Sequence, residues 1–147
     1  MSASKSERSP SRAAPRVQSI LSRDRGAMVC ERCQVADRPL SRMRGLLGRR
    51  ELARGSGLLL EPCGSIHTFF MRFPIDAVYL DDEWRVLRVR AGIGPWRVDG
   101  ARGARAVLEL AAGEAERAAI APGERLYMTP VPAAVAAPAG SGAEALR

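Results

Sequence analysis

The residues best equipped for chemistry are concentrated in one stretch, Glu61–Asp76 (EPCGSIHTFFMRFPID). It contains one of the three cysteines, the single histidine and all three phenylalanines, with a carboxylate at its end. A Cys63 thiolate, His67 as its base and Asp76 as the group that orients the histidine are the residue types of a cysteine hydrolase. The sequence therefore marks this stretch as a candidate site, and it leaves the reaction or ligand open.

Two other chemistries would use cysteine. Cys30, Cys33, Cys63 and His67 have spacings compatible with a tetrahedral zinc site, which would also allow a metal-dependent hydrolase. However, we expect Cys30 and Cys33 to lie in a strand, where side chains three residues apart point to opposite faces. A redox role for this pair is disfavoured because reactive cysteine pairs normally lie at a helix N-terminus. We therefore expect no cofactor, with zinc as the alternative.

The remaining possibility is a pocket for a small ligand or a protein partner, built by this stretch. Apolar walls could come from Phe69, Phe70, Met71, Phe73 and Trp84, although core packing competes for each of them. The candidate ligand-binding side chains are Arg44, His67, Arg72 and Asp76. We favour this non-enzymatic interpretation over the hydrolase.

Asp76 is the most informative of these residues. In an extended Ile75–Leu80 segment it shares a face with Val78 and Leu80, so the carboxylate should be at least partly buried. A buried carboxylate needs a cation or several hydrogen bonds. We expect an arginine or His67 as its partner, with loop amides as the alternative.

Short apolar segments separated by turns predict a mainly β domain: an antiparallel, jelly-roll-like β-sandwich or flattened barrel with one or two short helices. A helix should begin at Asp37, and a helical turn should lie within Gly113–Ile120. Ala91–Gly103 should be a loop. The expected strands are Ala27–Ala36, Gly57–Leu60, Ile66–Met71, Ile75–Leu80, Trp84–Arg90, Ala104–Leu110 and Glu124–Met128.

Composition indicates a single β-rich domain over residues 27–129 of the 147-residue chain. Residues 1–26 should be a disordered basic tail and residues 130–147 a disordered Ala/Pro-rich tail. Residues 1–50 carry twelve basic and four acidic side chains, so association with nucleic acid is an alternative function, and only through this basic tail. No apolar run suits a secretory signal or a membrane span, so we expect a soluble cytoplasmic protein.

Three blocks of sequence resemble the family with domain of unknown function 192 (DUF192), over roughly residues 28–129. The blocks are RGLLGR at Arg44–Arg49; GLLL at Gly57–Leu60 with FMR and PID at Phe70–Asp76; and LEL with PGE at Leu108–Glu124. The chain looks like a shorter branch of the family that lacks the Asn-Thr segment before the Pro-Ile-Asp motif. The resemblance implies a jelly-roll-like β-sandwich and no established activity. The motif positions, all without an assigned role, are Arg44, Gly45, Arg49, Met71, Asp76, Glu109 and Gly113.

Overall fold

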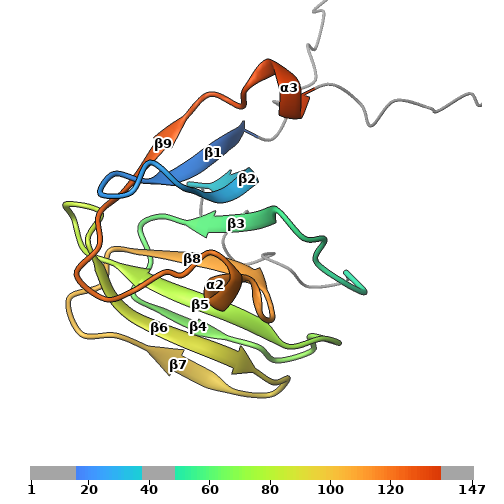
Figure 1. Ribbon diagram of the computed structural model, residues 1–147. Coiled ribbons are helices and arrows are strands. Elements are labelled where there is room, and N and C mark those ends of the chain that lie inside the picture. Colours follow the sequence, from blue (N-terminus) through green and yellow to red (C-terminus); the bar gives the residue numbers. More distant parts are fainter. Residues whose placement is uncertain (1–15, 38–48, 137–147) are drawn as a thin grey trace, which may run out of the picture.

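The computed structural model describes residues 16–37 and 49–136, which form a curled seven-stranded sheet, a two-stranded ribbon and two short helices (Figure 1). The curled sheet has the strand order β6-β5-β8-β3-β2-β1-β9 and resembles half of a barrel. Its strands are β1 (Arg16–Ser22), β2 (Met28–Ala36), β3 (Ser56–Leu60), β5 (Ile75–Leu80), β6 (Val86–Ile93), β8 (Ala106–Ala111) and β9 (Leu126–Thr129). All neighbouring strands run antiparallel except β2 and β3.

The ribbon pairs β4 (Ser65–His67) with β7 (Val98–Gly100), again antiparallel. The helices are α2 (Glu114–Arg117) and α3 (Ala133–Ala136). The predicted class, mainly β and mostly antiparallel with short helices, is confirmed. None of the helices within the described ranges is long and apolar enough to cross a membrane.

The curled sheet buries apolar side chains on both faces, because its central strands are apolar at consecutive positions. On β5, Val78 and Leu80 belong to a first core, which also receives Ala115 from α2. Ile75, Ala77 and Tyr79 of the same strand belong to a second core on the opposite face. Ile66 of β4 packs into that second core. The ribbon therefore covers one face of the sheet, and α2 covers the other.

Two segments of the predicted tails form secondary structure. Arg16–Ser22 lies within the predicted basic tail, but it forms β1 and pairs with both β2 and β9. This segment is ordered as a strand because the apolar side chain of Ile20 is completely buried in the first core. At the other end, α3 lies inside the segment predicted as the Ala/Pro-rich tail.

Two further boundaries differ from the prediction. The strand expected over Ile66–Met71 ends at His67, and a turn follows it. The expected loop Ala91–Gly103 contains the end of β6 and all of β7. The predicted helix after Asp37, with the candidate ligand residue Arg44, falls outside the described residues.

Candidate functional site

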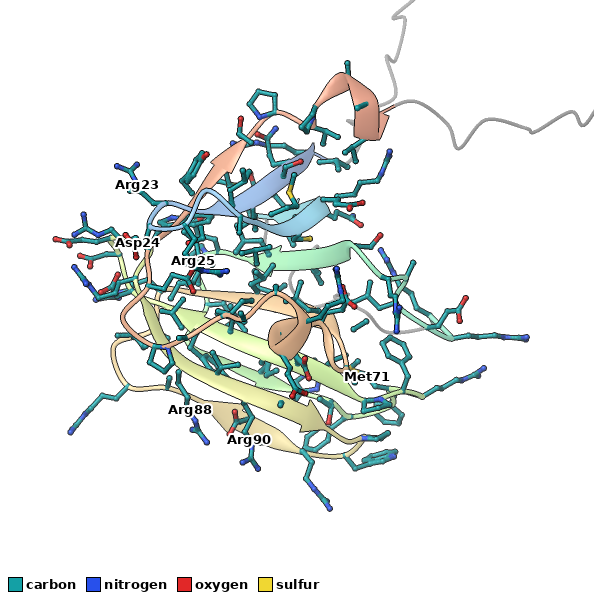
Figure 2. The ribbon with its side chains drawn as sticks, in the orientation of Figure 1. Arg23, Asp24, Arg25, Met71, Arg88 and Arg90 are labelled. Carbon is teal, nitrogen blue, oxygen red and sulfur yellow. The ribbon has the colours of Figure 1, made fainter. Side chains whose placement is uncertain are left out.

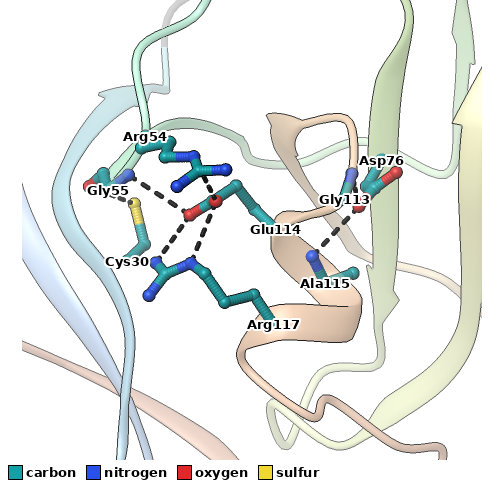
Figure 3. Close-up of polar contacts among 8 residues, drawn as sticks. All are labelled: Cys30, Arg54, Gly55, Asp76, Gly113, Glu114, Ala115 and Arg117. Atoms are coloured by element: carbon teal, nitrogen blue, oxygen red, sulfur yellow. Dashed lines mark hydrogen bonds and ion pairs between the residues drawn. The ribbon is translucent and has the colours of Figure 1, made fainter.

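Asp76 is completely buried, and its carboxylate accepts three backbone hydrogen bonds. Gly92 N donates to Oδ1 at 2.9 Å. Gly113 N and Ala115 N donate to Oδ2 at 2.9 and 3.0 Å, as Figure 3 shows. Among the described residues, the partners of Asp76 are these amides, which was the alternative expectation, and neither Arg72 nor His67 is one of them. Three backbone amides can stabilise the buried carboxylate without a cation. Each of them is a donor at the end of β6 or the start of α2 that would otherwise lack a hydrogen-bond partner.

Glu114 extends this buried polar network to the loop before β3. Its carboxylate accepts two hydrogen bonds from Arg117, at 3.0 and 2.6 Å, and one from Gly55 N at 3.3 Å (Figure 3). The hydrogen bonds from Arg117 hold the pKa of Glu114 below its usual value. Together the two carboxylates fasten α2 to the sheet, which is a structural task.

The structure does not assemble Cys63, His67 and Asp76 as a hydrolase would need. Both oxygens of Asp76 are occupied by backbone amides in the interior, whereas His67 is exposed on β4. The thiol of Cys63, which is half-buried, lies 3.0 Å from the carbonyl oxygen of Ser65.

The proposed zinc ligands are also divided between two places. Cys30 and Cys33 are completely buried in the first core, whereas Cys63 packs against the second core on the opposite face of the sheet. In the described ranges, no three His, Cys, Asp or Glu side chains lie close enough to hold a metal ion.

A β-bulge in β2 explains why Cys30 and Cys33 lie in the same core, contrary to the expected alternation. Gln18 of β1 pairs with Cys33 and Ile20 with Cys30, so two residues of β2 stand opposite the single residue Ser19. The hydrogen bond between the two thiols, with burial, raises the pKa of Cys33 far above its usual value. Burial and the raised pKa make the Cys33 thiol unsuited to act as a nucleophile.

The feature that stands out in the Glu61–Asp76 stretch is an exposed aromatic surface, formed by His67, Phe69, Phe70, Trp96 and Val98. Phe70 (70%), Val98 (68%) and Trp96 (57%) are the exposed large hydrophobic side chains of the described ranges. Their rings contact one another: the Phe70 and Trp96 centroids are 4.7 Å apart, and His67 stacks on Phe69 at 5.0 Å. We call these five residues the aromatic surface.

Two similar turns present the rings. In the turn Thr68–Met71, Met71 N donates to Thr68 O at 3.2 Å, and the third residue, Phe70, has φ +64°. In the turn Gly94–Arg97 the third residue is Trp96, with φ +62°. A positive φ at this position usually requires glycine, and it costs a bulky residue on the order of 1 kcal/mol.

Thr68, which is completely buried, joins the two turns. Its hydroxyl donates to Gly94 O at 2.7 Å and accepts from Arg97 N at 2.9 Å, bridging the two ends of the second turn. Its backbone also accepts from Trp96 N at 3.0 Å and donates to Arg97 O at 2.8 Å. Four hydrogen bonds from one residue therefore fix the position of Trp96 relative to Phe70.

Sequence reasoning found part of this surface. It named His67, Phe69 and Phe70, but expected the phenylalanines to be mainly core, and it missed Trp96. Met71 and Phe73 do pack into the second core, as expected. The signal for Trp96 was the Gly-Pro-Trp sequence, since Pro95 favours a turn that would expose the next residue.

Trp84, named with these residues as a pocket wall, lies elsewhere. It lines an open cavity of about 560 Å³ with residues of the β1–β2 connection and β9. An Arg125–Glu83 ion pair of 2.7 Å and the guanidinium of Arg23, 5.9 Å from the Tyr127 ring, contribute to its walls.

Glu109 occupies a family-motif position and is almost completely buried. It lies on β8 between Leu58 of β3 and Ala77 of β5, which belong to the second core. This desolvation raises the pKa of Glu109 to about 7.

The fold defines a class: a small domain in which a half-barrel sheet carries a two-stranded ribbon on one face. The chain belongs to the DUF192 family (Uncharacterized ACR), whose match covers residues 20–128. No curated protein of known function is similar enough in sequence to match.

Two solved structures share the fold. One is a protein from Sinorhizobium meliloti described as a "putative transcription regulator". Its sequence is 21% identical to this chain, and its structure matches with a TM-score of 0.69, over 78% of this chain and 95% of that one. The other is a protein of unknown function from Novosphingobium aromaticivorans, 23% identical with a TM-score of 0.66, over 76% of this chain and 83% of that one. At these identities the likeness concerns the fold.

Proposed function

We propose that this protein is a binding module and that its aromatic surface is the contact site for its partner. The observation that carries the proposal is the pair of turns that hold Phe70 and Trp96 exposed and in contact. Exposed aromatic rings lose favourable burial, and left-handed backbone adds strain, so the fold is less stable for having them there. Such costs are typical of sites that are retained for binding.

The surface also has the composition of a binding site. Tryptophan, tyrosine and arginine are the residues that most often dominate the energy of interfaces. Trp96 lies beside Arg97, and Phe70 lies two residues from Arg72, both arginines being exposed. Because Thr68 fixes the two turns, a partner would meet rings that are already ordered, which reduces the entropy lost on binding.

The candidate residues of the Glu61–Asp76 stretch take different roles in this proposal. His67 and Arg72 remain candidate contact residues, since both are exposed. Asp76 supports the domain from inside by fastening α2 and the end of β6 to β5. Cys30, Cys33 and Cys63 form no disulfide with one another, which suits a reducing compartment and supports a cytoplasmic location as part of this proposal.

The proposal is tested by photo-crosslinking in living cells. Phe70 is replaced by p-benzoylphenylalanine in one strain, and the exposed Arg102, at the opposite end of the ribbon, is replaced in a control strain. We expect an adduct at position 70 in at least about tenfold greater yield than at position 102, and its loss on Trp96→Ser. Equal yields at the two positions would remove the basis for the proposal.

A further inference from the structure

The aromatic surface lies at one end of the β4–β7 ribbon, because both turns are located there. We call this end of the ribbon the tip. His67 is the last residue of β4 and pairs with Val98, the first residue of β7. Phe69 and Phe70 follow His67, and Trp96 precedes Val98. Met71, whose side chain enters the second core, marks the base of this tip (Figure 2).

The arrangement of the rings argues against stacking of nucleic-acid bases. The Phe70 and Trp96 rings are tilted by 59° and the Phe69 and Trp96 rings by 34°, so these rings contact one another without forming a row of parallel faces. Proteins that bind single strands instead offer ring faces along a groove that successive bases can occupy. The aliphatic side chain of Val98, 68% exposed beside the rings, has no stacking face at all. The tip is therefore an apolar knob and not a stacking platform.

The charge around the tip is positive. Residues 67–74 and 94–98 include Arg72 and Arg97 and contain no acidic residue. The nearest carboxylate in sequence, Asp99, already accepts a hydrogen bond from Tyr79 Oη at 2.8 Å and lies 3.6 Å from Arg88 Nη2. Arg88 balances the charge of that carboxylate, and Arg90 projects from the neighbouring β6 as a further exposed cation (Figure 2). A second copy of this chain would meet the knob with like charges, so self-association through it is disfavoured.

Resting on the function proposed above, we propose that the partner of the aromatic surface is an anionic lipid bilayer. Phe70, Trp96 and Val98 would enter the interfacial region, where tryptophan and phenylalanine are favoured. Arg72 and Arg97 would lie at the level of the lipid phosphates, and the anionic surface attracts each of them. Membrane attachment without a spanning helix requires two signals: apolar side chains that enter the bilayer and basic residues that are attracted to anionic lipids. The aromatic surface and its arginines would supply both.

The test is co-sedimentation of the full-length protein with phosphatidylglycerol vesicles and with phosphatidylcholine vesicles. We expect binding to phosphatidylglycerol, reduced about tenfold or more by Phe70→Ser/Trp96→Ser and by Arg72→Glu/Arg97→Glu. The charge-matched control is Arg102→Glu/Arg105→Glu, which changes two exposed arginines at the opposite end of the ribbon and should retain most of the binding. Unchanged thermal unfolding of each variant verifies that the fold is intact.

A further variant, Phe70→Leu/Trp96→Leu, separates the classes of partner. Leucine still inserts into lipid but cannot stack on a base, so this variant should keep vesicle binding. The inference is overturned if wild-type protein ignores phosphatidylglycerol, or if the serine and control variants lose binding equally. Tight binding of a single-stranded oligonucleotide that the leucine variant abolishes would likewise overturn it in favour of nucleic acid. In either case an adduct at position 70 in cells would leave the proposed binding function standing.

Discussion

The substitution Asp76→Asn tests the buried network that supports the site. Asparagine has one carbonyl oxygen and one amino group in place of the two carboxylate oxygens. If the oxygen keeps the amides of Gly113 and Ala115, the amino group faces Gly92 N, and two donors then meet without an acceptor.

The expected loss follows from those contacts. One charge-assisted hydrogen bond disappears, at roughly 1.5–3 kcal/mol, and a buried amide is left unpaired at roughly 1–3 kcal/mol. The two remaining bonds also weaken, because bonds to a neutral acceptor are about half as strong. We expect a decrease of roughly 3–5 kcal/mol in the free energy of unfolding, a large share of the 5–15 kcal/mol typical of a domain.

Urea denaturation followed by tryptophan fluorescence measures this loss. The matched control is Asp81→Asn. Asp81 Oδ1 also accepts two backbone hydrogen bonds, from Glu83 N and Arg85 N, both at 2.9 Å. These contacts lie in an exposed turn, whereas those of Asp76 are buried. There the new amino group can turn toward water, so we expect a change below about 1 kcal/mol. Equal destabilisation by the two substitutions would refute the reasoning.

Three further predictions concern single residues. Burial raises the pKa of Glu109 from 4.5 to about 7, so the folded state favours the protonated form. Wild-type stability should therefore fall relative to Glu109→Gln as pH rises from about 4.5 to 7, by up to about 3 kcal/mol in total, and should level off above that range. Parallel pH profiles of the two unfolding free energies would contradict this. Thr68→Val removes both hydroxyl hydrogen bonds and should cost roughly 1–3 kcal/mol in denaturation, whereas Thr68→Ser should cost clearly less. Chelation with EDTA should leave the melting temperature unchanged, because Cys63 and Cys30 lie on opposite faces of the sheet; a drop of several degrees would show that metal contributes to stability.

Local sequence patterns predicted the fold class and most strands because the central strands are strongly apolar. Ile75–Leu80 was found with its correct bounds, since six consecutive buried residues leave little ambiguity. β1 was missed because Arg and Ser dominate the composition of its neighbourhood. Its pairing partner β9 lies about a hundred residues away in sequence, and no local pattern shows that contact.

The candidate site was located, but its chemistry was not. The collection of rare residues at Glu61–Asp76 pointed to the right part of the molecule. The exposure of Phe70 depends on a left-handed backbone, which a phenylalanine rarely adopts, so its residue type predicted burial. The contact with Trp96 depends on the pairing of β4 with β7, which join segments about thirty residues apart.

If Thr68 holds the aromatic surface in the conformation that binds a partner, substitutions at Thr68 should change binding at Phe70. The measurement is the yield of photo-crosslinked adduct at position 70 in the Thr68→Val and Thr68→Ser proteins, compared at equal amounts of folded protein. We expect the yield to fall severalfold with valine and to stay near the wild-type level with serine, because only serine keeps the hydroxyl that bridges Gly94 and Arg97. The same yield in both variants, or no adduct with either, would contradict this expectation.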